Sequence, residues 1–244
     1  MTTTKFFLKP GIALLALLQI ASCNFAQNRV KGSGHVVKED RQISNFRQLK
    51  VEGSMDVELV QAGNTTAKVE ADDNIVPLIE LVSEGDKLIV RIKKGYNINT
   101  HNNMVVYLTT PELYEASLAG SGDVELKGKF TSKDEIKLNL SGSGDLKGGE
   151  IDAPSVKAGI AGSGDLSVKG QTKEVELSIA GSGNFRGDEL LAEDVSVKIA
   201  GSGDASVYAS VKLEAKIAGS GNVNYKGSPQ VTTKIAGSGE VRKR

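Results

Sequence analysis

The chain repeats one short motif seven times, and this repeat limits the folds that it can adopt. Each copy consists of a hydrophobic residue, then Ala or Ser, then Gly-Ser-Gly, and then Asp, Asn or Glu. Counted from the first glycine, successive motifs are 22, 20, 19, 20, 18 and 18 residues apart. This period is typical of stacked repeats, in which each unit buries its apolar side against its neighbours. The first glycines are Gly120, Gly142, Gly162, Gly181, Gly201, Gly219 and Gly237.

The residues on both sides of each motif alternate between apolar and polar, as in a strand with one buried side. In the fourth copy, Val175, Leu177 and Ile179 precede the glycines at every second position, and Glu176 lies between them. After the motif the apolar pattern resumes at Phe185. Each repeat therefore predicts two short strands joined by a glycine corner, where a Cβ atom would be hard to accommodate.

The predicted fold class is all-β, a right-handed parallel β-helix-like solenoid over residues 114–244 with coils of about 20 residues. An antiparallel arrangement in which Gly-Ser-Gly closes hairpins is the alternative. The matching apolar columns favour coils, because vertical stacking explains why every repeat needs the same kind of residue at the same position.

Residues 24–113 are predicted to form a less regular β part that precedes the repeats. Degenerate copies of the motif begin at Val30 and at Val51, and residues 87–92 alternate as a strand. The segment 74–82, which contains Pro77, is expected to be either a short helix or an irregular strand.

The first 23 residues read as an export signal. A basic start is followed by an apolar run at residues 11–20, which is too short to cross a bilayer as a helix. The sequence Ile20-Ala21-Ser22-Cys23 resembles a bacterial lipobox, which predicts that Cys23 becomes the acylated first residue of the mature protein. Ordinary cleavage after Ala26 is the alternative, and both predict export. One cysteine allows no internal disulfide.

The composition argues against a nucleic acid as partner. Lys and Arg total 30 and Asp and Glu total 30, so no strong positive field attracts phosphates. The chain has five Tyr, six Phe and no Trp, which leaves few aromatic platforms on which bases could stack.

The position after each motif is the main candidate site. If the coils stack, its oxygens form a column, and the column could cap turns or bind a cation such as Ca²⁺ weakly. Two carboxylates about 4.8 Å apart in water repel by only about 1 kcal/mol, so the column needs no metal, and we predict turn caps and no cofactor. The residues are Asp123, Asp145, Asp165, Asn184, Asp204, Asn222 and Glu240.

No residue is predicted to be catalytic. The seven motif serines would need a base within hydrogen-bond reach, and the two histidines, His35 and His101, both lie outside the repeats, where we expect solvated loops. A carbohydrate-active enzyme on a β-helix, a polysaccharide lyase or a glycosidase, remains the alternative. Its site would be a concave cluster of carboxylates with Arg or Lys that interrupts the repeat.

Outside the repeats, several residues resemble a known family. They are Gly32-Ser33-Gly34, Val36, Glu39, Arg41, Phe46, Val51, Gly53, Asp56, Val57 and Gln61, followed by residues 107–113 and the Gly-Ser-Gly-Asp array. Together they are similar to the putative auto-transporter adhesin head GIN domain family. The resemblance implies an exported, all-β, cell-envelope protein of Gram-negative bacteria.

We therefore expect a non-catalytic lipoprotein of the outer membrane, facing the periplasm or the cell surface. Its regular surface would serve adhesion, contact with envelope polysaccharide or assembly with other envelope proteins, and its contact with the membrane would be the lipid anchor. A purely structural or assembly protein is a further alternative, favoured if the surface has no cleft.

Overall fold

The computed structural model describes residues 28–244, and the predictions for the export signal and Cys23 lie outside this range. Each Gly-Ser-Gly motif forms a corner between a front strand, which ends at its first glycine, and a return strand, which begins after its acidic or amide residue. Equivalent strands of successive coils pair in parallel. The predicted β-solenoid is thus confirmed, and the antiparallel hairpin arrangement is wrong.

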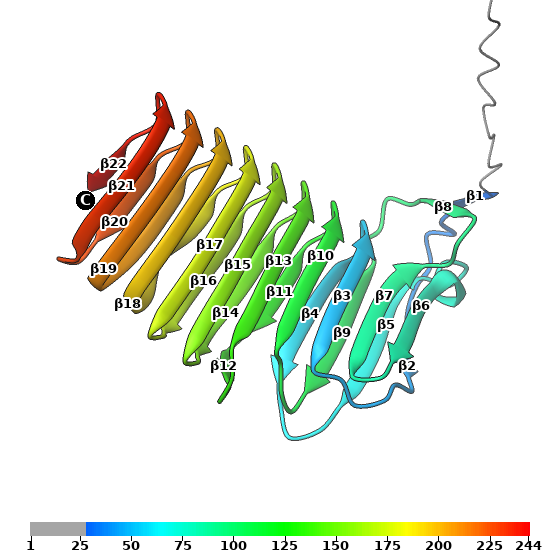
Figure 1. The fold of residues 1–244 in the computed structure, drawn as a ribbon. Helices are drawn as coiled ribbons and strands as arrows, with labels where there is room; N and C mark the ends of the chain where they lie inside the picture. Colours follow the sequence, from blue (N-terminus) through cyan, green and yellow to red (C-terminus); the bar gives the residue numbers. More distant parts are fainter. Residues whose placement is uncertain (1–27) are drawn as a thin grey trace, which may run out of the picture.

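The front strands form one face of the solenoid, called the front face (Figure 1). They run upward in this view, the chain returns downward behind them, and the coils advance to the left, which is a right-handed winding. In stacking order the front strands are β7 (Lys87–Ile92), β3 (Gln48–Gly53), β10 (Glu115–Gly120), β13 (Ile136–Gly142), β15 (Ser155–Gly162), β17 (Glu174–Gly181), the second parts of β18 (Phe185–Gly201) and β19 (Ala205–Gly219), and β21 (Gln230–Gly237).

The return strands form the opposite face, called the return face. β18 and β19 contribute their first parts to this face, because each runs on through the following corner into a front strand. In stacking order the return strands are β9 (Val105–Thr110), β4 (Asp56–Gln61), β11 (Val124–Lys127) with β12 (Lys129–Thr131), β14 (Leu146–Asp152), β16 (Leu166–Gln171), the first parts of β18 and β19, β20 (Val223–Lys226) and β22 (Val241–Lys243).

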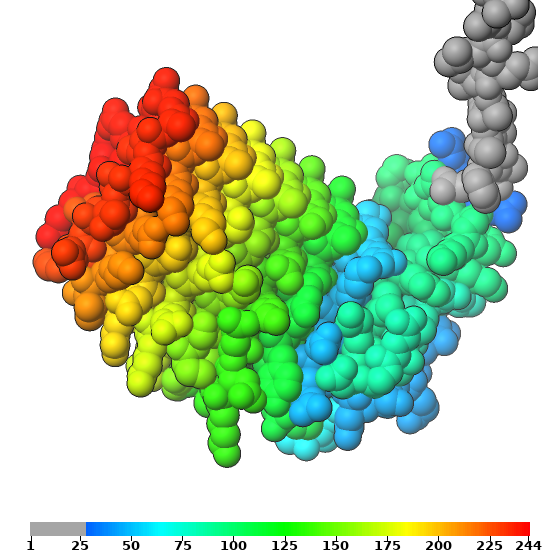
Figure 2. Space-filling model, viewed as in Figure 1, coloured from blue at the N-terminus to red at the C-terminus, as the bar shows by residue number. Residues whose placement is uncertain are grey.

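Antiparallel strands cap the N-terminal end of the stack. The cap comprises β2 (Val36–Arg41) and β5 (Thr66–Asp72), which extend the return face beyond β9, and β6 (Ile79–Glu84), which pairs with β7. The segment around Pro77 begins with the short helical piece that was one of the two expectations, a 3-10 turn at Val76–Leu78, which leads directly into β6. β6 itself is regular, because it pairs with β7 without a register shift. In Figure 2 the cap projects beyond the rows of atoms that the coils form on the front face.

The two degenerate motifs differ in structure. Gly53, in the second copy, stacks on Gly120 in register, so β3 and β4 form a genuine coil. The first copy does not, because it follows β1 (Asn28–Lys31), which pairs with β8 (Tyr96–Asn99) in a separate two-stranded sheet. Treating Gly32-Ser33-Gly34 as a copy of the repeat was therefore wrong. Its Ser33 instead bonds Asp73, with 2.5 Å between Oγ and Oδ1.

The apolar columns fill the space between the two faces. Leu177 and Ile179 of the front face and Phe185 of the return face are all at most 1% exposed, as the alternating pattern predicts. In the last coil the same column reaches Ile235, which is 43% exposed because no further coil covers it within the described residues.

The corner glycines are required by close stacking. Gly201 has φ of +134°, and a Cβ there would lie 2.2 Å from the carbonyl oxygen of Gly181 in the preceding coil. That oxygen accepts hydrogen bonds from the N–H groups of Ser202 and Gly203. A side chain at the first glycine would therefore push neighbouring coils apart.

Candidate functional site

The residues predicted as a column do form one, along the corner between the two faces. In every member before Glu240, one side-chain oxygen accepts a hydrogen bond from the backbone N–H of the equivalent residue in the next coil, as between Asp145 Oδ1 and Asp165 N at 3.1 Å. The column begins one coil earlier than predicted, at Asp56, whose Oδ1 accepts from the N–H of Asp123 at 3.0 Å. The other members, Asn184, Asp204, Asn222 and Glu240, continue the series.

The amide members reduce repulsion within this column. Asn184 Nδ2 donates to Asp165 Oδ1 at 2.9 Å, and Asn222 Nδ2 donates to Asp204 Oδ1 at the same distance. The second oxygen of Asp165 pairs with Arg186 at 2.7 Å. Residues 28–244 contain no group of three or more His, Cys, Asp or Glu side chains arranged to hold a metal ion. The column thus links coil to coil through hydrogen bonds.

Neither predicted histidine approaches the serine column. His35 lies just before β2, with its side chain 77% exposed and its Nδ1 3.7 Å from Asp73. His101 is exposed in the bend after β8. Neither histidine is therefore placed to activate a motif serine.

The return face, in contrast to the front face, interrupts the repeat. The pairing of strands β14 and β16 shifts register between Lys147 and Glu150. The pairing of β16 with β18 shifts between Ser167 and Lys169, and that of β18 with β19 shifts on both sides of Leu191. The front strands show no such shift. The unequal motif spacings are therefore absorbed mainly on the return face.

These interruptions form a groove of about 590 Å³ that crosses four coils. Two rows of side chains, in register from coil to coil, line it. The first row consists of Glu125, Lys147, Ser167 and Arg186. The second row, called the charged ridge, consists of Lys129, Glu150, Lys169 and Glu189.

The space between the two rows changes in width along the groove. Residues 126–128, 148–149, 168 and 187–188 lie between the rows in successive coils. At Gly149, where φ is +64°, a Cβ would lie 2.3 Å from the carbonyl oxygen of Leu126. Val168, which lies between the rows in the third coil, is only 5% exposed and packs into the core. Glycine is thus needed where the bulged coil lies against its neighbour.

Several charged groups of the groove are held by partners within the protein. Lys129 pairs with Asp152 at 2.8 Å, Lys127 with Glu58 at 2.7 Å, and Asp188 with Lys226 at 2.7 Å. The hydrogen bond from Lys226 lowers the pKa of the Asp188 carboxyl below its usual 3.8, so this group stays ionised. The corresponding bond to Asp152 raises the pKa of Lys129.

Four other groups form no ion pair within the described part of the chain. They are Lys147 in the first row and Glu150, Lys169 and Glu189 on the charged ridge. Ridge neighbours have opposite charges on adjacent strands, an arrangement that stabilises a sheet modestly. Their hydrogen-bonding groups nevertheless remain available to a ligand.

A second hollow of about 570 Å³ lies on the other side of the charged ridge. Its lining includes Leu191, which is 53% exposed, and Tyr208, which pairs with Leu191 in register. This hollow offers an apolar and aromatic surface beside the charged groove.

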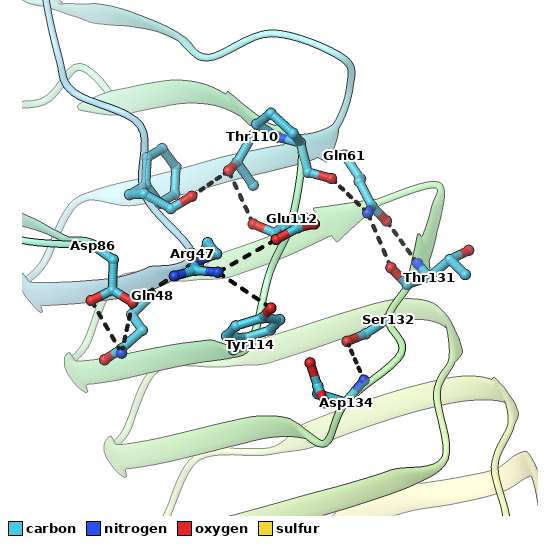
Figure 3. A network of polar contacts seen from close by, with 12 residues as sticks. Arg47, Gln48, Gln61, Asp86, Thr110, Glu112, Tyr114, Thr131, Ser132 and Asp134 are labelled. Atoms are coloured by element: carbon cyan, nitrogen blue, oxygen red, sulfur yellow. Dashed lines mark hydrogen bonds and ion pairs between the residues drawn. The ribbon is translucent and has the colours of Figure 1, made fainter.

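A polar network fixes the crossover that carries the chain from β9 to β10 (Figure 3). Arg47 lies over the ring of Tyr114, with 5.0 Å to the ring centre, and contacts Asp86 and Glu112 at 3.8 and 3.7 Å. Gln61 Nε2 donates to the carbonyl oxygen of Thr131 at 3.1 Å, and its Oε1 accepts from the N–H of Thr131 at 2.7 Å. Arg47 thus joins the turn between β6 and β7 to the crossover, and Gln61 joins β4 to β12, so we assign these contacts a structural role.

Sequence reasoning placed the column but missed the groove. One signal was the number of residues between successive motifs, which falls from 20 to 19 and rises to 20 again. The alternating apolar positions before each motif do not change, so the extra residues had to lie elsewhere in the coil. The doublet Gly148-Gly149 was a second signal, because it breaks the alternation that the other repeats keep.

The fold and the corner column define a β-solenoid whose relatives are adhesin-like proteins. The model of the putative auto-transporter adhesin head GIN domain matches residues 45–229, and the chain belongs to this family. The resemblance read from the sequence is thereby confirmed.

Solved structures share the fold over nearly the whole chain. A putative adhesin from Bacteroides fragilis is 24% identical, with a TM-score of 0.82, covering 88% of this chain and 100% of the other. A putative adhesin and a putative lipid binding protein, both from Parabacteroides distasonis, are 26% identical, with TM-scores of 0.70 and 0.74. Each of these two matches covers 89% of this chain and 100% of the other. No curated protein matches the chain.

The family and its adhesin-like members suggest an exported envelope protein. In the described range there is no helix with the length and apolar character needed to span a bilayer.

Proposed function

We propose that this chain is a non-catalytic envelope protein that binds envelope polysaccharide through the side of its solenoid. The observation that carries the proposal is the groove on the return face, where the strict repeat is interrupted and the lining side chains differ from coil to coil. Its volume is within the usual range for ligand sites, about 300–1,000 Å³. The family membership supports an adhesive role for such a surface.

A binding screen tests this function. The purified exported protein is applied to immobilised bacterial envelope glycans, and we expect at least one glycan to retain it. A matched solenoid lacking the groove is obtained by replacing Ser167 in the first row with Trp. Failure of the wild-type protein to bind any envelope glycan would contradict the proposal.

A carbohydrate-active enzyme is the second candidate, because the groove does gather carboxylates with Lys and Arg where the repeat is interrupted. A glycosidase needs an acid whose pKa is raised so that it can donate a proton. Asp188 has the opposite shift, since Lys226 lowers its pKa. Release of new reducing ends or unsaturated sugars from a bound glycan, lost in Glu150→Gln, would favour the enzyme.

We further propose that a lipid on Cys23 holds the protein to the outer membrane. The support is the lipobox-like sequence at residues 20–23. A lipid chain gives a polar protein the membrane affinity that it otherwise lacks. Metabolic labelling with a fatty acid should mark the wild-type protein and not Cys23→Ser, and an unlabelled wild-type protein would exclude the anchor.

A further inference from the structure

We infer that the groove binds a neutral, hydroxyl-rich polysaccharide that lies along the solenoid axis, across four coils. This inference rests on the proposed binding function and specifies its ligand, the direction of that ligand and its length. It follows from three properties of the groove: the direction of its two rows of side chains, its charge balance, and the hydrogen-bonding groups that form no ion pair.

The direction of the two rows sets the direction and length of the ligand. Both rows run from coil to coil, and therefore across the strands, because their members are in-register partners on neighbouring strands. Neighbouring strands are about 4.8 Å apart, so four coils place the ends of each row about 14 Å apart. An extended chain of several sugar units fits this course better than a compact ligand does.

The charge balance disfavours a polyanion. Five basic groups of the groove stand against four acidic ones. A nearly balanced surface creates little long-range field to attract one sign of charge. The basic groups are Lys127, Lys129, Lys147, Lys169 and Arg186, and the acidic groups are Glu125, Glu150, Asp188 and Glu189.

The unpaired groups match hydroxyls. Lys147 and Lys169 can only donate hydrogen bonds, whereas ionised Glu150 and Glu189 can only accept them. Because Glu150, Lys169 and Glu189 follow one another in register, acceptor and donor alternate along the ridge. A sugar hydroxyl both donates and accepts, so a chain of hydroxyls can bond successive ridge groups whatever their sign.

The test compares groove and front-face variants on defined oligosaccharides. The probes are neutral glucan, mannan and N-acetylglucosamine oligomers of increasing length, with polygalacturonate as the polyanion. Ser167→Trp fills the groove between Lys147 and Arg186, and Ser178→Trp on the outer side of β17 is its control. Lys169→Met is compared with Lys234→Met on β21. Thermal melts verify that each variant folds.

We expect one neutral series to bind, with affinity that rises with oligomer length and levels off once four coils are covered. Ser167→Trp should weaken binding at least tenfold and Lys169→Met a few-fold, while both front-face controls leave it unchanged. Binding should change little with salt, since no counterions are released.

Three results would overturn the inference. Equal binding by Ser167→Trp and Ser178→Trp would place the ligand elsewhere and leave the binding function intact. Preferential binding of polygalacturonate, weakened steeply by salt, would refute the neutral ligand. No binding of any probe by a wild-type protein that does retain envelope glycan would refute this ligand class, whereas no binding to either would refute the proposed function itself.

Discussion

The front face and the return face are built by the same repeats but differ in how strictly their coils match. From β13 to β21 every front residue has one partner in the next coil, without a shift. The return strands shift register at several places, and the groove lies where they do. The comparison teaches that one face holds the stack in register while the other can vary in length and chemistry.

The largest expected effect comes from deleting part of a coil. Removing the whole unit 162–180 joins Ala161 to Gly181 and rebuilds the motif, so the front columns stay in register. Removing the ten residues 177–186 instead displaces the apolar column and destroys a corner. Circular dichroism should show a cooperative melt for the whole-unit deletion and none for the partial one. Equal damage would mean that front-face register does not hold the stack.

The next effect is expected at the glycine that ends each front strand. Gly201→Ala adds a Cβ 2.2 Å from the carbonyl oxygen of Gly181 at positive φ, and we expect a loss of roughly 3 kcal/mol in the free energy of unfolding. Gly34→Ala, also at positive φ but with no atom within 4 Å of the added Cβ, should cost about 1 kcal/mol. Denaturant unfolding measures both, and similar costs would show that strain, not stacking, selects these glycines.

A smaller effect is expected in the hydrogen-bonded column along the corner between the two faces. Asp165→Ala removes the acceptor for the N–H of Asn184 and should cost about 1 kcal/mol. Asp165→Asn keeps this acceptor, loses only the exposed pair with Arg186, and should cost clearly less. Chelator should leave the melting temperature unchanged. A calcium-reversible fall of several degrees would instead make the column a metal site, since a ligand bound only to the folded state stabilises it.

The smallest effects should come from surface ion pairs, and they should be alike on the two faces. Lys226→Met on the return face and Lys157→Met on the front face each remove the main cause of a lowered pKa, of Asp188 and Glu176 respectively. Because these carboxyls titrate lower when folded, their pairs stabilise above the usual pKa, and this contribution disappears as the pH falls through the lowered value. NMR titration should show each carboxyl returning toward its usual pKa. A large loss of stability at neutral pH on one face only would contradict the account.

The repeat explains why so much of the fold could be predicted from the sequence. Columns such as Leu177 beside Val197 pack against their own equivalents, so one repeat predicts the surroundings of the next. The cap could not be predicted in this way. Its strands pair with partners that are distant in the sequence, as Val36 does with Asp72. A repeated pattern does not indicate such pairings, because the paired segments are not copies of one another. The crossover that brings β10 beside β3 was hidden for the same reason.

The candidate site was only half predictable. The corner column follows from a fixed position after each motif, and only its first member, Asp56, was missed because Gly53-Ser54-Met55 lacks the second glycine. The groove depends on where extra residues are accommodated within a coil. Glu150 and Lys169 become neighbours only through a register shift, which spacing alone does not locate.

An insertion scan tests the contrast between the two faces most directly. One alanine is inserted in turn after each residue from 175 to 201, and the thermal midpoint of each variant is measured. We expect insertions at 187–188 and 192–193, where the register already shifts, to lower the midpoint little. Insertions within 175–181 and 195–201 should lower it strongly, because each turns the following apolar side chains outward. A uniform loss across the coil, or greater tolerance on the front face, would contradict the account.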